Sequence, residues 1–412
     1  MRRARPRPEE LSAAMREFFL NPDFDRTLAG GRYAPETGDA ALLREMPWHF
    51  LLAADPGDTV IVHAPLPAGF QAYAETKGLA LPGTIPHPGF TPYAEFVPFG
   101  WNAQASALAA RYREPSRGPD PAVVKAANSR AFALELERRR QDGGYGGRLL
   151  AGYSGLEEFL ADRPPSENWV VKGEHGFAGT GNIRVSGGGP AAADRPRLEA
   201  LLAAHGRAVV EPWHERVQDM AVLFTSGPDG TVGGFRGHIL NNSRDGAFLG
   251  VEVEADRLPP PEWRDGLRGN AEIAARALAG LGYAGPVGID AYTHRVGGET
   301  RLRPLVDVNA RLSMALPAHG LASRLPGRRL RWSWHKPGKL RLPDSYPDLE
   351  RRLGESAFDP RRGTGILAVS PLFREDGSGS KPKRISFALV ADSAEGLRGL
   401  QADFARALGR GT

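Results

Sequence analysis

The segment LVDVNAR at residues 305–311 places polar side chains within an apolar strand. Side chains alternate between the two faces of a β-strand, so Asp307 and Asn309 project from one face, about 7 Å apart along the strand. Val306 and Val308 are expected to face the other way, into a core. Because Asp and Asn are depleted in strands, two of them on one face indicate a function, although a solvent-exposed face would also accommodate them.

A second strand is predicted just before this segment. The runs 287–295 and 300–309 are joined by a Gly-Gly pair that is typical of a β-hairpin turn. Asp290 lies on the first of these strands, so the hairpin brings it toward Asp307 and Asn309. The three side chains offer only oxygen ligands, which suit Mg²⁺, because this hard cation completes its shell with phosphate oxygens and water. The hairpin is therefore a candidate magnesium site.

A glycine-rich loop follows the predicted strand at 169–172. Its glycines, at 173, 176, 179 and 181, let the backbone approach a ligand closely and turn its N–H groups toward an anion. Lys172 ends the strand, where its ammonium can reach phosphate oxygens. The loop leads into another strand, at 182–185, and lacks a Gly-Lys-Ser/Thr sequence, which excludes Walker A and Rossmann loops. A plain hairpin turn is the alternative, although a two-residue turn needs at most two glycines.

The segment AVVEPW at 208–213 is predicted to be a strand that ends at its proline. Its backbone could read the edge of a purine, with Glu211 accepting hydrogen bonds from a ribose. A core strand that ends in an exposed glutamate is an equal alternative. Arg216 and Asp219, which follow, are further candidates for ligand binding.

Substrate-binding candidates lie on the predicted strand 231–240. Arg236 and His238 share one strand face. Arg236 could bind a carboxylate with two hydrogen bonds, and His238 could act as a base for an amine. A hydrogen-bonded structural histidine is the alternative for His238.

Composition limits the function classes. The 412 residues predict two or three domains, and 41% hydrophobic with 25% charged residues is typical of a globular protein. The absence of cysteine excludes disulfides, thiolate catalysis and cysteine-ligated metals. No apolar run approaches the roughly 20 residues that span a bilayer, and no signal-peptide segment follows the basic N-terminus, so a cytoplasmic enzyme without membrane association is expected.

The net charge of +5 is compatible with a phosphate-bearing ligand. No basic run is interleaved with aromatic residues in a recognisable module, so no nucleic-acid partner is expected. The densest cationic segment runs from Arg324 to Lys339 and is interpreted as a solvated connector, with an anion-binding edge of the active site as the alternative.

Four parts are predicted along the chain. Residues 1–120 form an α/β unit, in which a strand at 58–63 leads to a helix at 67–78. The glycine-rich loop belongs to 121–206, and 207–330 holds the candidate hinge and metal site. Residues 331–412 contain two strands around a Gly/Ser turn and a terminal helix.

Taken in order, these segments resemble the ATP-grasp superfamily. The matching segments are Lys125 to Arg130, Val171-Lys172-Gly173 with its loop, Val210-Glu211-Pro212, Gly288-Ile289-Asp290 and Val306 to Arg311. The resemblance covers about 121–325 and the preceding α/β unit. Within the superfamily, the chain is similar to bacterial carboxylate–amine ligases that join amino acids or peptides. It implies an α/β ATP-grasp fold with an N-terminal open α/β pre-ATP-grasp domain and a small C-terminal α+β extension.

The resemblance also implies ATP and Mg²⁺ as cofactors and assigns roles to residues. The implied nucleotide-binding residues are Arg130 (or Lys125), Lys172, Gly176, Phe177, Ala178, Gly179, Val209, Val210 and Glu211, the last three forming the adenine hinge with Glu211 at the ribose. Asp290, Asp307 and Asn309 would hold Mg²⁺, although the second metal ligand of the family is commonly Glu. Arg311 would contact the transferred phosphate or the acyl intermediate.

The implied reaction is the activation of a carboxylate as an acyl phosphate, followed by attack of an amine, both from small-molecule substrates such as amino acids or peptides. A homodimer is compatible with the family. An ATP-grasp kinase that phosphorylates a hydroxyl and a non-catalytic nucleotide-binding module remain the alternatives.

Overall fold

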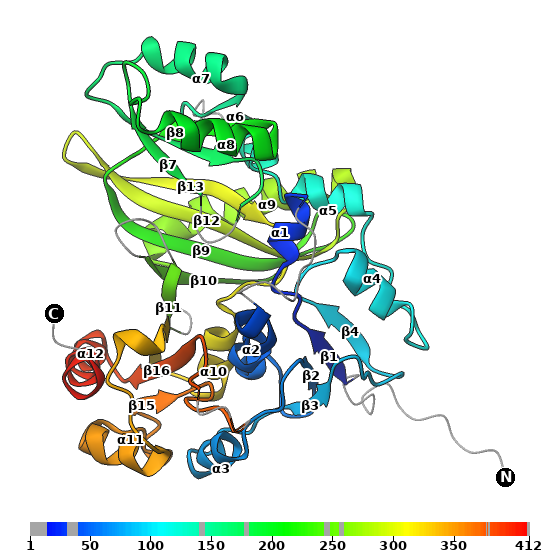
Figure 1. Cartoon of the computed structure of the whole chain (residues 1–412), viewed down its shortest axis with the longest axis vertical. Coiled ribbons are helices and arrows are strands. Elements are labelled where there is room, and N and C mark those ends of the chain that lie inside the picture. Colours follow the sequence, from blue (N-terminus) through cyan, green and yellow to red (C-terminus); the bar gives the residue numbers. More distant parts are fainter. Residues whose placement is uncertain are drawn as a thin grey trace.

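The computed structural model describes residues 15–30, 40–139, 145–176, 181–242, 248–254, 259–375, 377 and 380–409. These residues form three sheets: two of four strands and one of eight (Figure 1). None of the helices in these ranges is long and apolar enough to cross a membrane.

The N-terminal unit is a parallel sheet of order β3-β2-β1-β4 flanked by helices (Figure 1). Its elements are β1 (Arg16–Phe19), α1 (Phe24–Leu28), α2 (Ala40–Phe50), η2 (Leu51–Ala53), β2 (Thr59–Val62), α3 (Ala68–Thr76), β3 (Gly83–Pro86), β4 (Glu95–Pro98) and α4 (Ala103–Ala109). Parallel strands need crossover connections, which the helices and longer loops provide. The predicted strand at 58–63 and helix at 67–78 are confirmed as β2 and α3.

A second sheet, of antiparallel order β5-β8-β6-β7, carries the glycine-rich loop between β6 and β7. Its elements are α5 (Pro121–Ala127), α6 (Arg130–Arg138), β5 (Arg148–Ala151), α7 (Gly152–Ala161), β6 (Asn168–Gly173), β7 (Ile183–Ser186), α8 (Arg195–His205) and β8 (Arg207–Pro212). Leucines of α7 and α8 pack with the valines of β6 and β8 in one core. The Oγ of Ser129 accepts a hydrogen bond from the Phe132 N–H at 3.1 Å and so caps the start of α6.

The large sheet is antiparallel, with order β13-β12-β9-β10-β11-β14-β16-β15. Its strands are β9 (Arg216–Ser226), β10 (Val232–Asn242), β11 (Phe248–Glu254), β12 (Gly285–Val296), β13 (Glu299–Asn309), β14 (Arg329–His335), β15 (Gly365–Ala368) and β16 (Ile385–Ala391). Its helices are α9 (Pro261–Leu281), α10 (Leu316–Arg324), η3 (Pro337–Lys339), α11 (Tyr346–Leu353), η4 (Gly354–Ser356) and α12 (Ala394–Leu408). The long helix α9 packs its apolar face on β9, β12 and β13. It ends at Gly282, whose φ of 87° is a conformation that glycine adopts without strain.

The cationic segment from Arg324 to Lys339 is not a solvated connector, and that interpretation is wrong. It contains β14, which lies between β11 and β16 with Leu330 and Trp332 fully buried. Its arginines point to the other face, where Arg329 pairs with Glu254. Charges that alternate with apolar residues are typical of a strand with one buried face. The segments after residue 330 therefore extend the large sheet, and the predicted boundary at 330/331 falls inside β14.

Candidate active site

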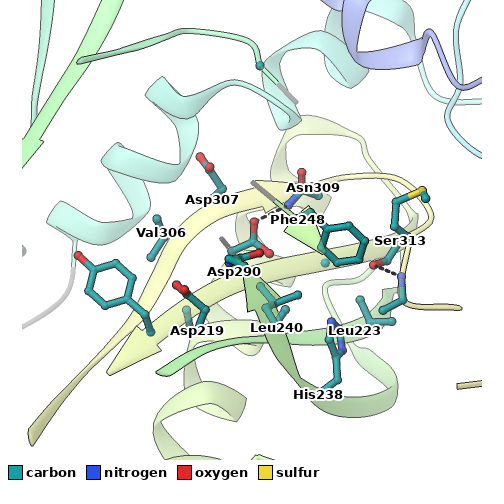
Figure 2. Close-up of a pocket in the computed structure, with 18 of the residues that line it drawn as sticks. Asp219, Leu223, His238, Leu240, Phe248, Asp290, Val306, Asp307, Asn309 and Ser313 are labelled. Carbon is teal, nitrogen blue, oxygen red and sulfur yellow. Dashed lines mark hydrogen bonds between the residues drawn. The ribbon is translucent and has the colours of Figure 1, made fainter. Parts of the chain in front are cut away.

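A cleft of about 180 Å³ opens beside the large sheet, and residues of the glycine-loop sheet also line it (Figure 2). Strands β9, β10, β12 and β13 supply much of its lining, and helix α6, strand β6 and Arg311 after β13 supply further charged residues. The predicted site residues that line it are Arg130, Lys172, Gly176, His238, Asp290, Asp307, Asn309 and Arg311. Arg216 and Asp219, the further candidates, also line it and form an ion pair of 2.8 Å.

The hairpin β12–β13 brings two carboxylates together, as the sequence predicts. Asp290 and Asp307 are direct cross-strand partners, and Gly288 pairs with Asn309 two positions along the ladder. The Nδ2 of Asn309 donates to Oδ2 of Asp290 at 3.3 Å (Figure 2). Burial, and secondarily the charge of Asp307, raise the pKa of Asp290 to about 6. A cation between the two carboxylates would relieve this repulsion.

Val306 corrects one detail of the predicted hairpin. It lines the cleft beside Asp307 (Figure 2), whereas Val308 lies in the core as expected. The register of β12 against β13 shifts between Asp290 and Tyr292, so strict alternation fails at this point. Because of this register shift, the apolar side chain of Val306 lines the cleft next to the carboxylate of Asp307.

Arg311 ties the N-terminal unit to this acidic wall. Its Nε donates to Oδ1 of Asp25 in α1 at 3.1 Å, and its Nη2 donates to Oδ1 of Asn309 at 3.1 Å. Its guanidinium also lies over the ring of Phe99. The amide oxygen of Asn309 thus faces Arg311, and metal binding requires this amide to turn over.

The donor set fits a hard cation that keeps non-protein ligands. In the part of the chain that the structure describes, no three His, Cys, Asp or Glu residues are grouped to hold a metal ion. Asp290, Asp307 and Asn309 contribute two carboxylates and one amide oxygen. Mg²⁺ usually takes one or two carboxylates and completes its octahedron with phosphate oxygens and water, so these residues fit it in the presence of a nucleotide.

Lys172 belongs to a buried network of four charges. Its Nζ pairs with Oε1 of Glu211, whose Oε2 accepts a hydrogen bond from Arg303 at 2.9 Å. Arg303 also donates two hydrogen bonds to Glu137, at 2.7 and 3.0 Å. Burial alone would raise the pKa of Glu211, but Arg303 and Lys172 outweigh it and hold that pKa below its ordinary value. The network fixes Lys172 at the cleft.

The predicted hinge residues lie behind the cleft surface. Val209 and Val210 are buried in β8, where Val209 pairs with Lys172 across the sheet. Glu211 is 3% exposed, so the alternative of an exposed strand end is wrong. Because its two oxygens are engaged with Lys172 and Arg303, a ribose contact would have to compete with them, whereas Asp219 lies directly on the cleft.

Arg130 lines the cleft, whereas Lys125 does not. Lys125 is exposed on α5, while Arg130 donates to the Gly173 carbonyl at 2.6 Å and lies 3.3 Å from Asp307. A Cβ at Gly176 would lie 2.7 Å from a nitrogen of the Arg130 guanidinium, so a side chain there would displace the end of this arginine. The loop residues Phe177, Ala178 and Gly179 lie outside the described residues.

The structure separates Arg236 from His238, and the prediction that they form one substrate site is wrong. His238 is 1% exposed and lines the cleft, whereas Arg236 is exposed and lines a second cleft beside α9. The β9–β10 register is regular from Arg236 to Leu240, so the two residues lie two positions apart on one strand and nevertheless line different clefts. Burial lowers the pKa of His238 to about 3, and its Nδ1 lies 3.2 Å from Nε2 of His319.

Sequence reasoning missed Asp25, Tyr292, Arg303 and His319. Tyr292 lines the cleft, and its hydroxyl accepts a hydrogen bond from Arg303 at 3.1 Å. Asp25 and His319 come from segments remote in sequence, and no local pattern marks them.

No protein-family model matches the sequence, and no curated protein matches it. Solved structures match over nearly the whole chain. Phosphoribosylamine–glycine ligase of Thermotoga maritima aligns with a TM-score of 0.58 at 12% identity, covering 96% of this chain and 97% of that chain. N5-carboxyaminoimidazole synthetase of Staphylococcus aureus, complexed with ADP, gives 0.53 at 11%, covering 95% and 97%. Biotin carboxylase of Campylobacter jejuni, in a β-γ-ATP complex, gives 0.51 at 13%, covering 96% and 91%.

The chain has the ATP-grasp fold. This confirms the predicted fold class, with the N-terminal parallel sheet as the pre-ATP-grasp unit. Helix α6, the described loop residues Gly176 and Asn182, and the hairpin β12–β13 face the cleft, together with strands β9 and β10. At these identities the similarity establishes the fold alone, so residue roles rest on the geometry of the cleft.

Proposed function

We propose that this chain is an ATP- and Mg²⁺-dependent ligase that activates a carboxylate as an acyl phosphate and joins it to an amine, releasing ADP and phosphate. The observation that carries the proposal is the composition of one cleft. Lys172, Arg130, Asp290, Asp307 and Arg311 all line it. Solved proteins with this fold include a ligase and a synthetase complexed with ADP, which supports the nucleotide.

The cationic residues are suited to a triphosphate. Lys172 ends β6 at the glycine-rich loop, and Arg130 lies across that loop near Asp307. Asp290, Asp307 and Asn309 would hold the Mg²⁺, which neutralises charge on the β- and γ-phosphates when bound. Arg311 can then stabilise charge that develops on the transferred phosphoryl group. The backbone N–H groups of the glycine-rich loop can add further anion contacts.

A carboxylate is a poor electrophile, and phosphorylation gives it a good leaving group. An amine can then attack the acyl carbon, so that a C–N bond forms while the bond to phosphate breaks. Acyl phosphates react with water, so the cleft must exclude it during this step. We propose amino acids or peptides as the small-molecule carboxylate and amine, because charged side chains that line the cleft can bind their charged groups. The reaction itself requires no nucleophilic side chain.

A screen of amino acids and short peptides in pairs tests the proposal. We expect Mg²⁺-dependent phosphate release only when a carboxylate and an amine are both present, together with a product of the mass of the amide. Asp307→Asn should abolish turnover, whereas Asp265→Asn on the exposed face of α9 should not. A stable phosphoester formed without an amine would identify a kinase instead. Absence of nucleotide binding would contradict any catalytic role.

A further inference from the structure

Two buried histidines meet across the wall of the candidate active site. His238 of β10 is 1% exposed and His319 of α10 is 7% exposed. The Nδ1 of His238 lies 3.2 Å from the Nε2 of His319, and the rings are edge-to-face at 5.2 Å. Buried polar groups are normally paired, and here each histidine is the hydrogen-bond partner of the other.

The pair separates two different cavities. His238 lines the candidate active site, and His319 lines a second cleft of about 350 Å³ between β10, α9 and α10. Arg236 and Arg268 lie at this second cleft, and Arg268 also lies over the ring of Phe235. The hydrogen bond between the histidines is therefore a polar connection from the active-site cleft to a cationic surface cleft.

The hydrogen bond couples the two rings chemically. A neutral imidazole carries one N–H donor and one acceptor nitrogen. The bond uses Nδ1 of His238 and Nε2 of His319, which leaves Nε2 of His238 and Nδ1 of His319 outside it. When His238 donates to His319, the Nε2 of His238 is an acceptor and the Nδ1 of His319 carries a proton. A proton that arrives at one end can thus leave from the other.

We infer that His238 and His319 form a proton path that carries the amine proton out of the active site during amide formation. This inference rests on the proposed function. As the C–N bond forms and phosphate leaves with the electron pair of the C–O bond, the proton on nitrogen passes to Nε2 of His238. The Nδ1 proton of His238 passes to Nε2 of His319, and the Nδ1 proton of His319 passes to water in the second cleft. The tautomers reset when the active site next opens to solvent.

The buried surroundings of the two histidines allow a proton to pass along the pair without either ring remaining protonated. Burial lowers the pKa of His238 to about 3, and burial with the charges of His238 and Arg236 lowers that of His319. Both rings are therefore neutral near pH 7 and available as acceptors. A path through side chains is useful in this reaction, because a cleft that excludes water to protect an acyl phosphate has no solvent to take the proton.

The test separates the two halves of the reaction. Acyl-phosphate formation is followed by carboxylate-dependent positional isotope exchange in ¹⁸O-labelled ATP, and amide formation by product mass. In His319→Gln we expect exchange within about twofold of wild type and amide formation reduced about 10²- to 10⁴-fold, the usual contribution of acid–base catalysis. His335→Gln, a control on β14 outside both clefts, should leave both unchanged.

A second variant distinguishes proton transfer from packing. In His319→Ala, imidazole added to the solution can enter from the second cleft, and we expect it to restore amide formation without altering exchange. Undiminished amide formation in His319→Gln, an equal loss in both half-reactions, or failure of imidazole to restore His319→Ala would each overturn the path. If wild type shows neither half-reaction, the proposed function fails first, and the path fails with it.

Discussion

Asp290 should lower the stability of the metal-free protein, and replacing it should raise that stability. Its side chain is partly buried at the cleft opposite Asp307, and its pKa is raised from 3.8 to about 6. The folded state therefore holds the proton more tightly than the unfolded state. Stability gained from this protonation is present at low pH and is lost as the pH rises through about 6.

The expected magnitude follows from the two pKa values. A difference of about two units corresponds to about 3 kcal/mol at pH 7.5, where the carboxylate is charged in both states. The same linkage gives about 1.5 kcal/mol at pH 5 and about 0.5 kcal/mol at pH 4, where the unfolded state is also protonated in part. Asp290→Asn removes this penalty and can keep a hydrogen bond to Asn309.

Urea unfolding in EDTA at pH 7.5, 5 and 4 measures the difference between Asp290→Asn and wild type. We expect the variant to be more stable by about 3 kcal/mol at pH 7.5, with the gain shrinking toward pH 4. Asp265→Asn, on the exposed face of α9, should show no such trend. A loss of stability in Asp290→Asn, or a gain that is independent of pH, would refute the reasoning.

Three further predictions concern the buried network and the helix cap. Arg303→Met leaves the carboxylates of Glu137 and Glu211 buried without the positive charge that pairs with them, so we expect the free energy of unfolding in urea to fall by about 3–5 kcal/mol at pH 7.5. The loss should diminish as the pH falls and the carboxylates take up protons. Lys172→Met removes a charge from the cleft, and the Kd for Mg²⁺·ATP, measured by calorimetry, should rise about 10- to 100-fold, because hydrogen bonds to charged groups contribute about 1.5–3 kcal/mol. Ser129→Ala deletes the cap of α6, and urea unfolding should show a loss of about 1 kcal/mol; an unchanged midpoint would contradict the assigned cap.

Local patterns explain most of what the sequence predicts correctly. The hairpin β12–β13 places Asp290 beside Asp307 because both residues belong to one short-range unit with a defined turn. Likewise, Ser129 caps α6 through a contact three residues away. Features of this kind depend on neighbouring residues and can be read before the fold is known.

Long-range contacts explain what the sequence does not show. Arg303 meets Glu137 and Glu211 only after three elements pack together, and Asp25 reaches Arg311 across 286 positions of the chain. Strand β14 is not predicted from the sequence, because its arginines give the segment a strongly cationic composition. The apolar residues that alternate with them form a buried face only in the folded sheet. The exposure of Val306 depends on a register shift that no local rule specifies.

The metal site is tested most directly by a crystal structure with Mn²⁺ and a non-hydrolysable ATP analogue, in which anomalous scattering locates the cation. We expect Mn²⁺ bound by oxygens of Asp290, Asp307 and Asn309 and by the terminal phosphates, with Lys172 contacting the nucleotide. A nucleotide bound outside this cleft, or a cation that no residue of the hairpin ligates, would contradict it.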